Sequence, residues 1–296
     1  MRTFRHIPGA KFYHVYTKGI ESSIIFKDRE DYIVGMNYIP IYIMRYKLQL
    51  LAFVLMTNHF HFVVYCMEAE AWNFIDSYRM VLSKYLSRKY GGHKFMKNHE
   101  RTCKEINLEF EGLKKTIAYV LNNPVKAGYG FSFQNYEWGS AKCYFPSADP
   151  LADTRSLSEL GTREAYRMLK TKTKIDKLLR INARGYIEPY SYICVGYVET
   201  LFKRYSSLEY FVTSSKSRQK SKEEVPFGFS DELLLRVLNE IIYKRYDGIR
   251  IDEMSIAIKG EIITILKKQF NCNSKQIARL MGLTISEVVN IIAVSR

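Results

Sequence analysis

The chain has 296 residues, enough for one large domain or for two or three smaller domains that each bury a core. Hydrophobic residues make up 47% of it and charged residues 25%, proportions that exclude a largely disordered protein. With 45 Lys and Arg against 30 Asp and Glu, the net charge is +15, and a field of that sign attracts polyanions such as nucleic acid or an anionic membrane surface.

The first 130 residues predict interspersed strands and helices. In chain order these are a strand at 13–17 that Gly19 ends, a helix from Phe26 that Asp28 caps and Pro40 interrupts, strands at 49–54 and 60–65, a helix at 72–89 that Gly91 and Gly92 end, and a helix at 110–121 that Asn123-Pro124 ends. One sheet covered by helices, an α+β fold, is the natural way to bury such elements.

The rest of the chain divides into three further segments. Asp149-Pro150 indicates a boundary, and residues 162–182 predict a strongly basic helix. A Ser- and Lys-rich stretch begins at Thr213 and is typical of a linker. We therefore expect a first α+β domain at 1–150, a basic helical extension at 151–212, a linker at 213–230 and an all-α domain at 231–296.

The cellular location follows from cysteine usage and hydropathy. Five well-separated cysteines without a Cys-x-x-Cys pair fit a reducing cytosol, and no apolar leader follows Met1. Residues 48–67 lack Asp, Glu, Lys and Arg and are long enough to span a bilayer. Because Asn58, His59 and His61 lie in its middle, where polar groups are costly, buried strands explain the stretch better. We expect a cytoplasmic protein without a membrane partner.

The sharpest chemical feature is the pair His59 and His61. On a strand at 60–65, the period of two puts both imidazoles on one face and Phe60 and Phe62 on the other. Two such imidazoles form half of a divalent metal site, and two partly buried histidines with ordinary hydrogen bonds are the alternative. No histidine follows His99, so a zinc site of widely spaced histidines is disfavoured. An oxygen donor as further ligand favours Mg²⁺ or Mn²⁺.

The helix expected at 110–121 carries a second candidate. Its apolar side runs from Phe110 to Leu121, and Tyr119 falls about 150° from the centre of that side at ~100° per residue. Lys115 and Asn123 lie one turn before and after Tyr119, on its own face. Tyr119 is therefore either a surface tyrosine or a phenolic nucleophile. A free phenol has a pKa of about 10, so attack at neutral pH requires a cation or an acceptor that favours phenolate.

Several motifs together resemble a known family over about residues 5–150. The sequence resembles the IS200-like Y1 transposases of the HUH class, and among them the REP-associated tyrosine transposases. The resemblance rests on these residues, in the family's order and spacing: Tyr13-His-Val, Gly19, Phe26, Asp31, Leu55-Met-Thr-Asn-His-Phe-His-Phe-Val-Val64, Tyr119-Val-Leu-Asn-Asn-Pro-Val-Lys-Ala-Gly128 and Tyr136-Glu-Trp-Gly-Ser140.

The resemblance implies a ferredoxin-like antiparallel sheet with His59 and His61 as metal ligands on a central strand. It implies that Tyr119 becomes covalently joined to a DNA 5′-phosphate, and that Asn123 is the third ligand or a polar partner in the site. The implied substrate is single-stranded hairpin or repeat DNA in a prokaryotic, nucleoid-associated setting, handled by a homodimer. In this sequence Thr57 stands where the family often has proline, a change that we expect to be tolerated because it precedes the ligands.

Residues 274–292 predict a helix, a turn at Gly282 and a second helix that Thr284 and Glu287 begin as a capping box. This is the pattern of a helix-turn-helix, whose second helix can enter the major groove of duplex DNA. The residues available to read bases are Ser286, Asn290 and Arg296, and on the first domain Lys115 and Lys126 are candidates for backbone contacts. A helical hairpin used for packing or dimerisation is the alternative.

Taken together, the leading hypothesis is a metal-dependent transposase that cleaves and transfers single-stranded DNA. A regulator that binds DNA without catalysis is the first alternative. The second is an HUH replication or nicking endonuclease, although relaxases commonly place their tyrosine before the histidines, whereas here Tyr119 follows them.

Overall fold

The computed structural model describes residues 2–17, 24–91, 96, 100–127, 132–170, 176–218, 231–270 and 272–294. Of the positions discussed above, Gly19, Gly92, His99, Gly128, Arg296 and the linker residues 219–230 lie outside the described residues.

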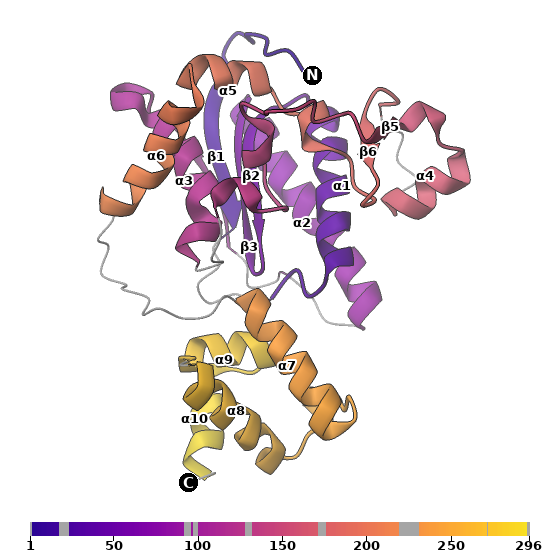
Figure 1. Cartoon of the computed structure of the whole chain (residues 1–296), viewed down its shortest axis with the longest axis vertical. Coiled ribbons are helices and arrows are strands. Elements are labelled where there is room, and N and C mark those ends of the chain that lie inside the picture. Colours follow the sequence, from indigo (N-terminus) through magenta and orange to yellow (C-terminus); the bar gives the residue numbers. More distant parts are fainter. Residues whose placement is uncertain are drawn as a thin grey trace.

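A four-stranded antiparallel sheet is the centre of the fold, with strand order β2–β3–β1–β4 (Figure 1). Its strands are β1 (Lys11–Thr17), β2 (Gln49–Met56), β3 (His59–Cys66) and β4 (Arg101–Glu105). Helix α1 (Arg29–Arg45) joins β1 to β2, and α2 (Glu68–Tyr90) joins β3 to β4. The chain order βαββαβ with this strand order is the ferredoxin-like arrangement, so the expected α+β class and sheet are confirmed.

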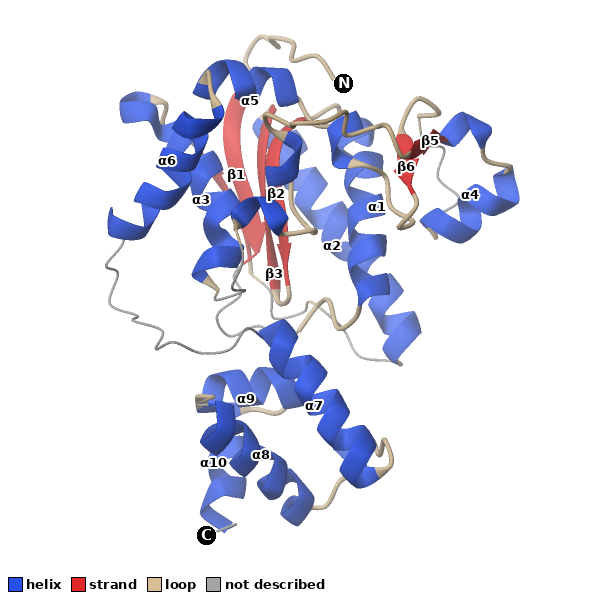
Figure 2. Cartoon of the chain, in the orientation of Figure 1, coloured by secondary structure: helices blue, strands red, loops and turns tan. Residues whose placement is uncertain are grey.

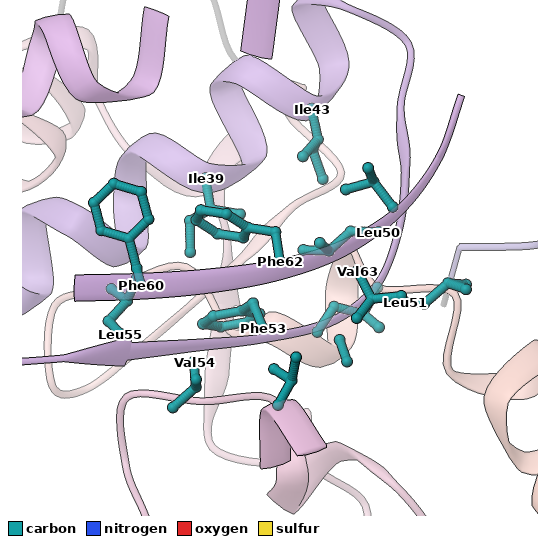
Figure 3. Packing of buried hydrophobic residues seen from close by; sticks show 14 of the residues in the cluster. Ile39, Ile43, Leu50, Leu51, Phe53, Val54, Leu55, Phe60, Phe62 and Val63 are labelled. Carbon is teal, nitrogen blue, oxygen red and sulfur yellow. The ribbon is translucent and has the colours of Figure 1, made fainter. Parts of the chain in front are cut away.

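The alternation along β3 separates the core from the candidate site. Phe60 and Phe62 contact Tyr78 of α2, with ring centroids 5.0 and 5.3 Å away. All eight residues of β2 are buried, because this strand is covered on both faces. Figure 3 shows these apolar side chains of β2 and β3 packed with those of α1. The odd-numbered residues of β3 face the opposite side, toward helix α3.

Helix α1 begins as the sequence predicts and ends later. Asp28 caps it, and a reciprocal capping box with Asp31 satisfies the first backbone amides. The expected interruption at Pro40 is wrong, since the helix continues through it to Arg45. Proline removes one backbone hydrogen bond. Here nearly every residue around Pro40 is buried, and this packing outweighs the loss.

Helix α3 (Gly112–Lys126) differs from the expected helix at both ends. Phe110 is 85% exposed in a left-handed turn with φ 50°, so it does not belong to the apolar side predicted for it. The helix also continues through Pro124. It packs on the face of the sheet opposite α1 and α2, and α6 (Tyr205–Arg218) covers its outer side (Figure 1).

Residues 136–144 cover the outer edge of β2. Leu55 N donates to the carbonyl of Trp138 at 2.8 Å, and Ser140 N donates to that of Phe53 at 3.0 Å. Gly139 permits this approach, since a Cβ there would lie 3.3 Å from the Phe53 carbonyl oxygen. The motif at 136–140 thus protects a sheet edge that would otherwise be open to pairing with another chain.

The expected extension 151–212 is part of the first domain's core. Buried residues from Leu157 to Val212 belong to the same hydrophobic cluster as the sheet. The long basic helix expected at 162–182 is wrong: α4 ends at Leu169, and 180–182 form a strand. The elements are β5 (Thr154–Ser156), α4 (Thr162–Leu169), β6 (Arg180–Asn182) and α5 (Val195–Phe202). Helix α6 contains residues 213–218, which are therefore helical rather than linker.

All secondary structure elements in the described part of the C-terminal unit are helices (Figure 2). It consists of α7 (Asp231–Tyr246), α8 (Ile256–Phe270), α9 (Ser274–Met281) and α10 (Ile285–Val294). It has its own hydrophobic cluster, which Ile24 of the first domain joins.

Single-turn 3-10 helices lie in both parts of the chain, at Glu109–Glu111 (η1), Phe133–Asn135 (η2), Ala141–Cys143 (η3), Leu157–Glu159 (η4), Pro189–Ser191 (η5) and Ile251–Glu253 (η6).

Among the described residues, no single helix has the length and apolar character needed to cross a membrane; the pair α9 and α10 meets that test only jointly, across a bend of 104°.

Candidate functional site

His59 and His61 lie on the same face of β3, as the strand period predicts. Their ring centroids are 5.0 Å apart and their planes are nearly perpendicular, at 89°. His61 is buried and His59 is half-buried, at the end of the strand next to the β2–β3 turn. In that turn the Thr57 carbonyl accepts from the amides of Ile25 and Phe26, so the turn is held by backbone hydrogen bonds.

Each of the two imidazoles uses its Nδ1 atom in a hydrogen bond. His59 Nδ1 donates to Asn58 Oδ1 over 2.7 Å. His61 Nδ1 lies 3.0 Å from Nε2 of His14. The nitrogen that these contacts do not use is Nε2 on both rings. A metal-binding histidine commonly has its second nitrogen in such a hydrogen bond.

His14 and Tyr16 of β1 are further members of the site, which the sequence motifs did not single out. The Tyr16 ring centroid is 5.3 Å from that of His61, and the His14 and Tyr16 rings stack at 4.5 Å. The sequence nevertheless contains a pattern that could have identified these two residues. The alternation of the strand at 13–17 puts His14 and Tyr16 on one face, and the ferredoxin-like strand order places β1 beside β3.

Tyr119 of α3 joins this cluster. Its ring centroid lies 5.7 Å from that of His61 and 5.8 Å from that of His14, edge-on to both. Helical spacing predicts Tyr119 far from the apolar side, yet the ring is half-buried against the sheet. The prediction fails because α3 is covered by both the sheet and α6 and therefore has no single apolar side.

A cation lies next to Tyr119, but it is Lys126 and not Lys115, which helical spacing places one turn before Tyr119. Lys126 Nζ is 4.7 Å from the centroid of the Tyr119 ring, two turns along the same helix. Lys115 donates instead to the carbonyl of Phe110 and is exposed. Lys126 therefore stays a candidate for the site, whereas Lys115 holds the turn that precedes α3.

Burial controls the protonation of the cluster. It raises the pKa of Tyr119, with a smaller contribution from Tyr16, so the phenol is neutral at pH 7. Burial lowers the pKa of His14 to about 4, and the charge of Lys104 acts in the same direction. It also lowers the pKa of His61 well below 6.5, with further contributions from His59 and His14. His14 and His61 are thus neutral imidazoles at pH 7, the form that can bind a metal ion.

Asn123 contacts its own helix. Its Nδ2 donates to the carbonyl of Tyr119 at 2.9 Å and to that of Val120 at 3.4 Å. Pro124 has no amide hydrogen with which to pair the Val120 carbonyl, and the side chain of Asn123 supplies one in its place. The amide nitrogen is therefore committed to local backbone, and a metal-binding role for Asn123 would fall to its Oδ1 atom.

The residues present fit a divalent cation only in part. The tautomer of His59 and the neutral state of His61 suit metal binding. Among the described residues, however, no group of three or more His, Cys, Asp and Glu is arranged to hold a metal ion. A cation held by His59 and His61 would need oxygen donors from another source, such as Asn123, water or a DNA phosphate.

The C-terminal helices place the other candidates on the surface. Ser286 and Asn290 are exposed on α10, and Glu287 closes the predicted capping box by accepting from the backbone amide of Thr284 at 2.7 Å. On the same helix Val288 is buried, whereas Val289 is 51% exposed.

A hollow of about 610 Å³ lies at the opposite end of β1 from Tyr16. Phe12, Tyr65 and Tyr197 line it, with Lys11 and Glu105 among its polar residues. Lys11 and Glu105 form an ion pair at 2.8 Å, which leaves this hollow without an excess of positive charge. The cluster of His14, His61 and Tyr119, rather than this hollow, is the candidate site, because it brings together a phenol, neutral imidazoles and the ammonium group of Lys126.

No protein-family model matches the sequence, and no curated protein matches it. One solved structure that is similar is that of a REP-associated tyrosine transposase bound to a REP hairpin. It is 16% identical, has a TM-score of 0.33, and the match covers 47% of this chain and 82% of that chain.

Proposed function

We propose that the protein is a tyrosine transposase that cleaves single-stranded hairpin DNA and transfers the cut strand through a tyrosine–DNA bond. One observation carries the proposal. The folding of β3 and α3 against each other brings the Tyr119 ring within 5.7 Å of the His61 ring, next to His59, although the two motifs are far apart in the sequence. The motif resemblance supports the same function.

The reaction balances without an external energy source. The phenolic oxygen of Tyr119 attacks a DNA phosphorus, the bond to the 3′-oxygen breaks, and the leaving strand takes up the proton lost by the phenol. The product is a 5′-phosphotyrosine and a 3′-hydroxyl. Since one phosphoester replaces another, a second strand's 3′-hydroxyl can reverse the step and complete strand transfer.

The chain's own residues prepare this step. The raised pKa of Tyr119 keeps the phenol protonated until DNA is bound, and Lys126 is positioned to stabilise negative charge that develops beside the ring. His59 and His61, with Asn123, would hold Mg²⁺ or Mn²⁺. When bound, such an ion supplies positive charge that polarises the scissile phosphate.

A labelled hairpin oligonucleotide with single-stranded flanks, incubated with the protein and Mn²⁺, tests the proposal. The wild type and Tyr210→Phe, which removes the hydroxyl of a 65% exposed tyrosine on α6, should both form an adduct that survives denaturation and is destroyed by protease. Tyr119→Phe should form none. An equal amount of adduct from Tyr119→Phe, or none from the wild type with any hairpin, would overturn the assignment. Cleavage without rejoining would favour the nicking endonuclease.

The α9–α10 pair favours a second candidate, a DNA-binding regulator without catalysis. These helices meet at a bend of 104°, within the range of a helix-turn-helix, and α10 exposes Ser286 and Asn290. A Ser286→Ala/Asn290→Ala variant should lose affinity for duplex sites if α10 reads DNA. A His59→Ala/His61→Ala variant that keeps wild-type DNA occupancy and biological effect would favour the regulator.

The homodimer stays a prediction, and light scattering of the purified protein with and without hairpin DNA measures its oligomeric state.

A further inference from the structure

His14 is a member of the cluster that has no part in the proposed function. It lies on β1 opposite Val63 of β3, which makes it the diagonal neighbour of His61. Its Nε2 atom is 3.0 Å from Nδ1 of His61, within hydrogen-bond distance. Its ring stacks on Tyr16 at 4.5 Å and meets the edge of Tyr119 at 5.8 Å. His14 therefore has a fixed place between the histidine pair and the tyrosine.

Two ring nitrogens at this separation share one proton, and its location decides what His61 can bind. If His61 Nδ1 donates to His14, the lone pair of His61 lies on Nε2. If His14 Nε2 donates to His61, a neutral His61 carries its proton on Nε2 and that atom cannot bind a cation. The two arrangements have the same heavy-atom geometry and opposite consequences.

His59 indicates which arrangement suits the site. Its Nδ1 contacts a carbonyl-type oxygen, Oδ1 of Asn58, which can only accept a hydrogen bond. His59 thus carries its proton on Nδ1 and its lone pair on Nε2. For the two rings to hold one ion with the same nitrogen, His61 must have the same tautomer, and His14 is the neighbour in contact with its Nδ1.

We propose that His14 is a positioning residue that accepts a hydrogen bond from His61 Nδ1 and thereby holds His61 in the tautomer whose Nε2 binds a divalent cation. Partners of this kind orient metal-binding histidines and typically change metal affinity by about 10- to 100-fold when they are removed. The inference deepens the proposed function and rests on the metal role assigned there to His59 and His61.

The tautomer can be read directly by NMR of the ¹⁵N-histidine-labelled protein, free of metal and DNA, with the His61 signals assigned from a His61→Ala spectrum. In the wild type we expect a protonated Nδ1 and an unprotonated Nε2 on His61. His14→Phe keeps a ring of similar size but cannot accept a hydrogen bond, and it should shift His61 toward the Nε2-protonated form. His14→Gln offers an amide oxygen as acceptor and should restore the wild-type tautomer.

Metal affinity gives an independent readout. Titration with Mn²⁺, followed by the loss of the free-ion EPR signal, should show binding at least about tenfold weaker in His14→Phe. Binding in His14→Gln should stay within about threefold of the wild type. His6→Phe is the matched control, because His6 is an exposed histidine that contacts Tyr65 and lies outside the cluster. Its Mn²⁺ affinity should not change.

A wild-type His61 protonated on Nε2 would overturn the inference, and so would equal Mn²⁺ affinity in His14→Phe, His14→Gln and the wild type. If His14→Phe does not fold, the wild-type tautomer alone decides. Failure of the proposed function looks different. A protein that binds Mn²⁺ in a His14-dependent way but forms no DNA adduct would exclude cleavage and leave the role of His14 intact.

Discussion

The position of Asn123 allows its structural role and its proposed metal role to be measured separately. The side chain pairs a backbone carbonyl, that of Val120, which Pro124 leaves without its usual helical donor. The same side chain is expected to turn its amide oxygen toward the cation. Asn123→Asp removes the amide donor and keeps an oxygen, whereas Asn123→Ala removes both. The two variants should therefore rank differently in stability and in Mn²⁺ affinity.

The effect on stability follows from the contacts in the last turn of α3. Asn123→Ala loses one hydrogen-bond donor, which costs about 1 kcal/mol, and regains up to about 0.6 kcal/mol through the better helix propensity of alanine. Asn123→Asp loses the same donor and places a negative charge at the helix C-terminus, which adds roughly 0.3–1 kcal/mol to the loss. The free energy of unfolding should therefore decrease from wild type to Ala to Asp.

The effect on metal binding runs in a different order. A carboxylate suits Mg²⁺ or Mn²⁺ at least as well as an amide oxygen does, so Asn123→Asp should bind Mn²⁺ as tightly as the wild type or more tightly. Asn123→Ala should bind about tenfold more weakly, which corresponds to about 1.4 kcal/mol. Stability is measured by urea unfolding in EDTA, and affinity by Mn²⁺ titration.

Thr116→Ala is the matched control on the same helix. Its hydroxyl donates to the carbonyl of Gly112 at 2.8 Å, a side-chain-to-backbone hydrogen bond remote from the last turn. Its loss should lower stability without changing Mn²⁺ affinity. If the wild type and both Asn123 variants bind Mn²⁺ equally, Asn123 is not part of the metal site. If both variants unfold at wild-type urea concentrations, the hydrogen-bond argument is refuted.

Three further predictions concern stability. The folded protein holds the pKa of His14 near 4 and that of His61 well below 6.5, so the unfolded chain binds more protons between these values. The free energy of unfolding should therefore fall as the pH drops from about 6.5 toward 4, by up to about 1.4 kcal/mol per pH unit for each histidine. Urea unfolding at pH 7.5 and 5.5 measures this, and a pH-independent midpoint would contradict it. Mn²⁺ at 100 times its Kd should stabilise the protein by about 2.7 kcal/mol. This stabilisation should appear as an increase in Tm that EDTA reverses and that the His59→Ala variant lacks. An equal Tm increase in that variant would place the ion elsewhere. Asp31→Ala removes a fully buried carboxylate that pairs with Lys89 at 2.9 Å and should cost roughly 3 kcal/mol in urea unfolding, whereas a loss below 1 kcal/mol would show that the pair adds little.

The face assignment of His59 and His61 could be predicted because a buried strand has a rigid period of two and a one-residue shift would bury the wrong set. The contact with Tyr119 could not be derived from the period of its helix. Helical spacing identifies one apolar side, and α3 is covered by two elements, of which α6 lies far along the chain. Helical spacing singled out Tyr119 as a candidate, but it did not predict that the ring lies half-buried against the sheet.

Strand β4 shows where local patterns give no signal. Arg101–Glu105 has five residues, three of them charged and none buried, so its sequence reads as a loop. It is an edge strand, and charged edges of this kind avoid pairing with other chains. Its identity comes from antiparallel pairing with β1, which only the three-dimensional structure provides.

The charge distribution connects the two parts of the chain to different kinds of DNA contact. Residues 231–296 contain 10 Lys and Arg and 8 Asp and Glu, so the net charge of +15 lies almost entirely in residues 1–230. On α10, Ile285 and Val289 are 42% and 51% exposed beside Ser286 and Asn290. Attraction to phosphates, and with it the steep loss of affinity with salt, should therefore come from the part that contains Tyr119. Any reading of DNA by α10 would depend on short-range polar and apolar contacts, because this unit has little charge with which to attract a strand by itself.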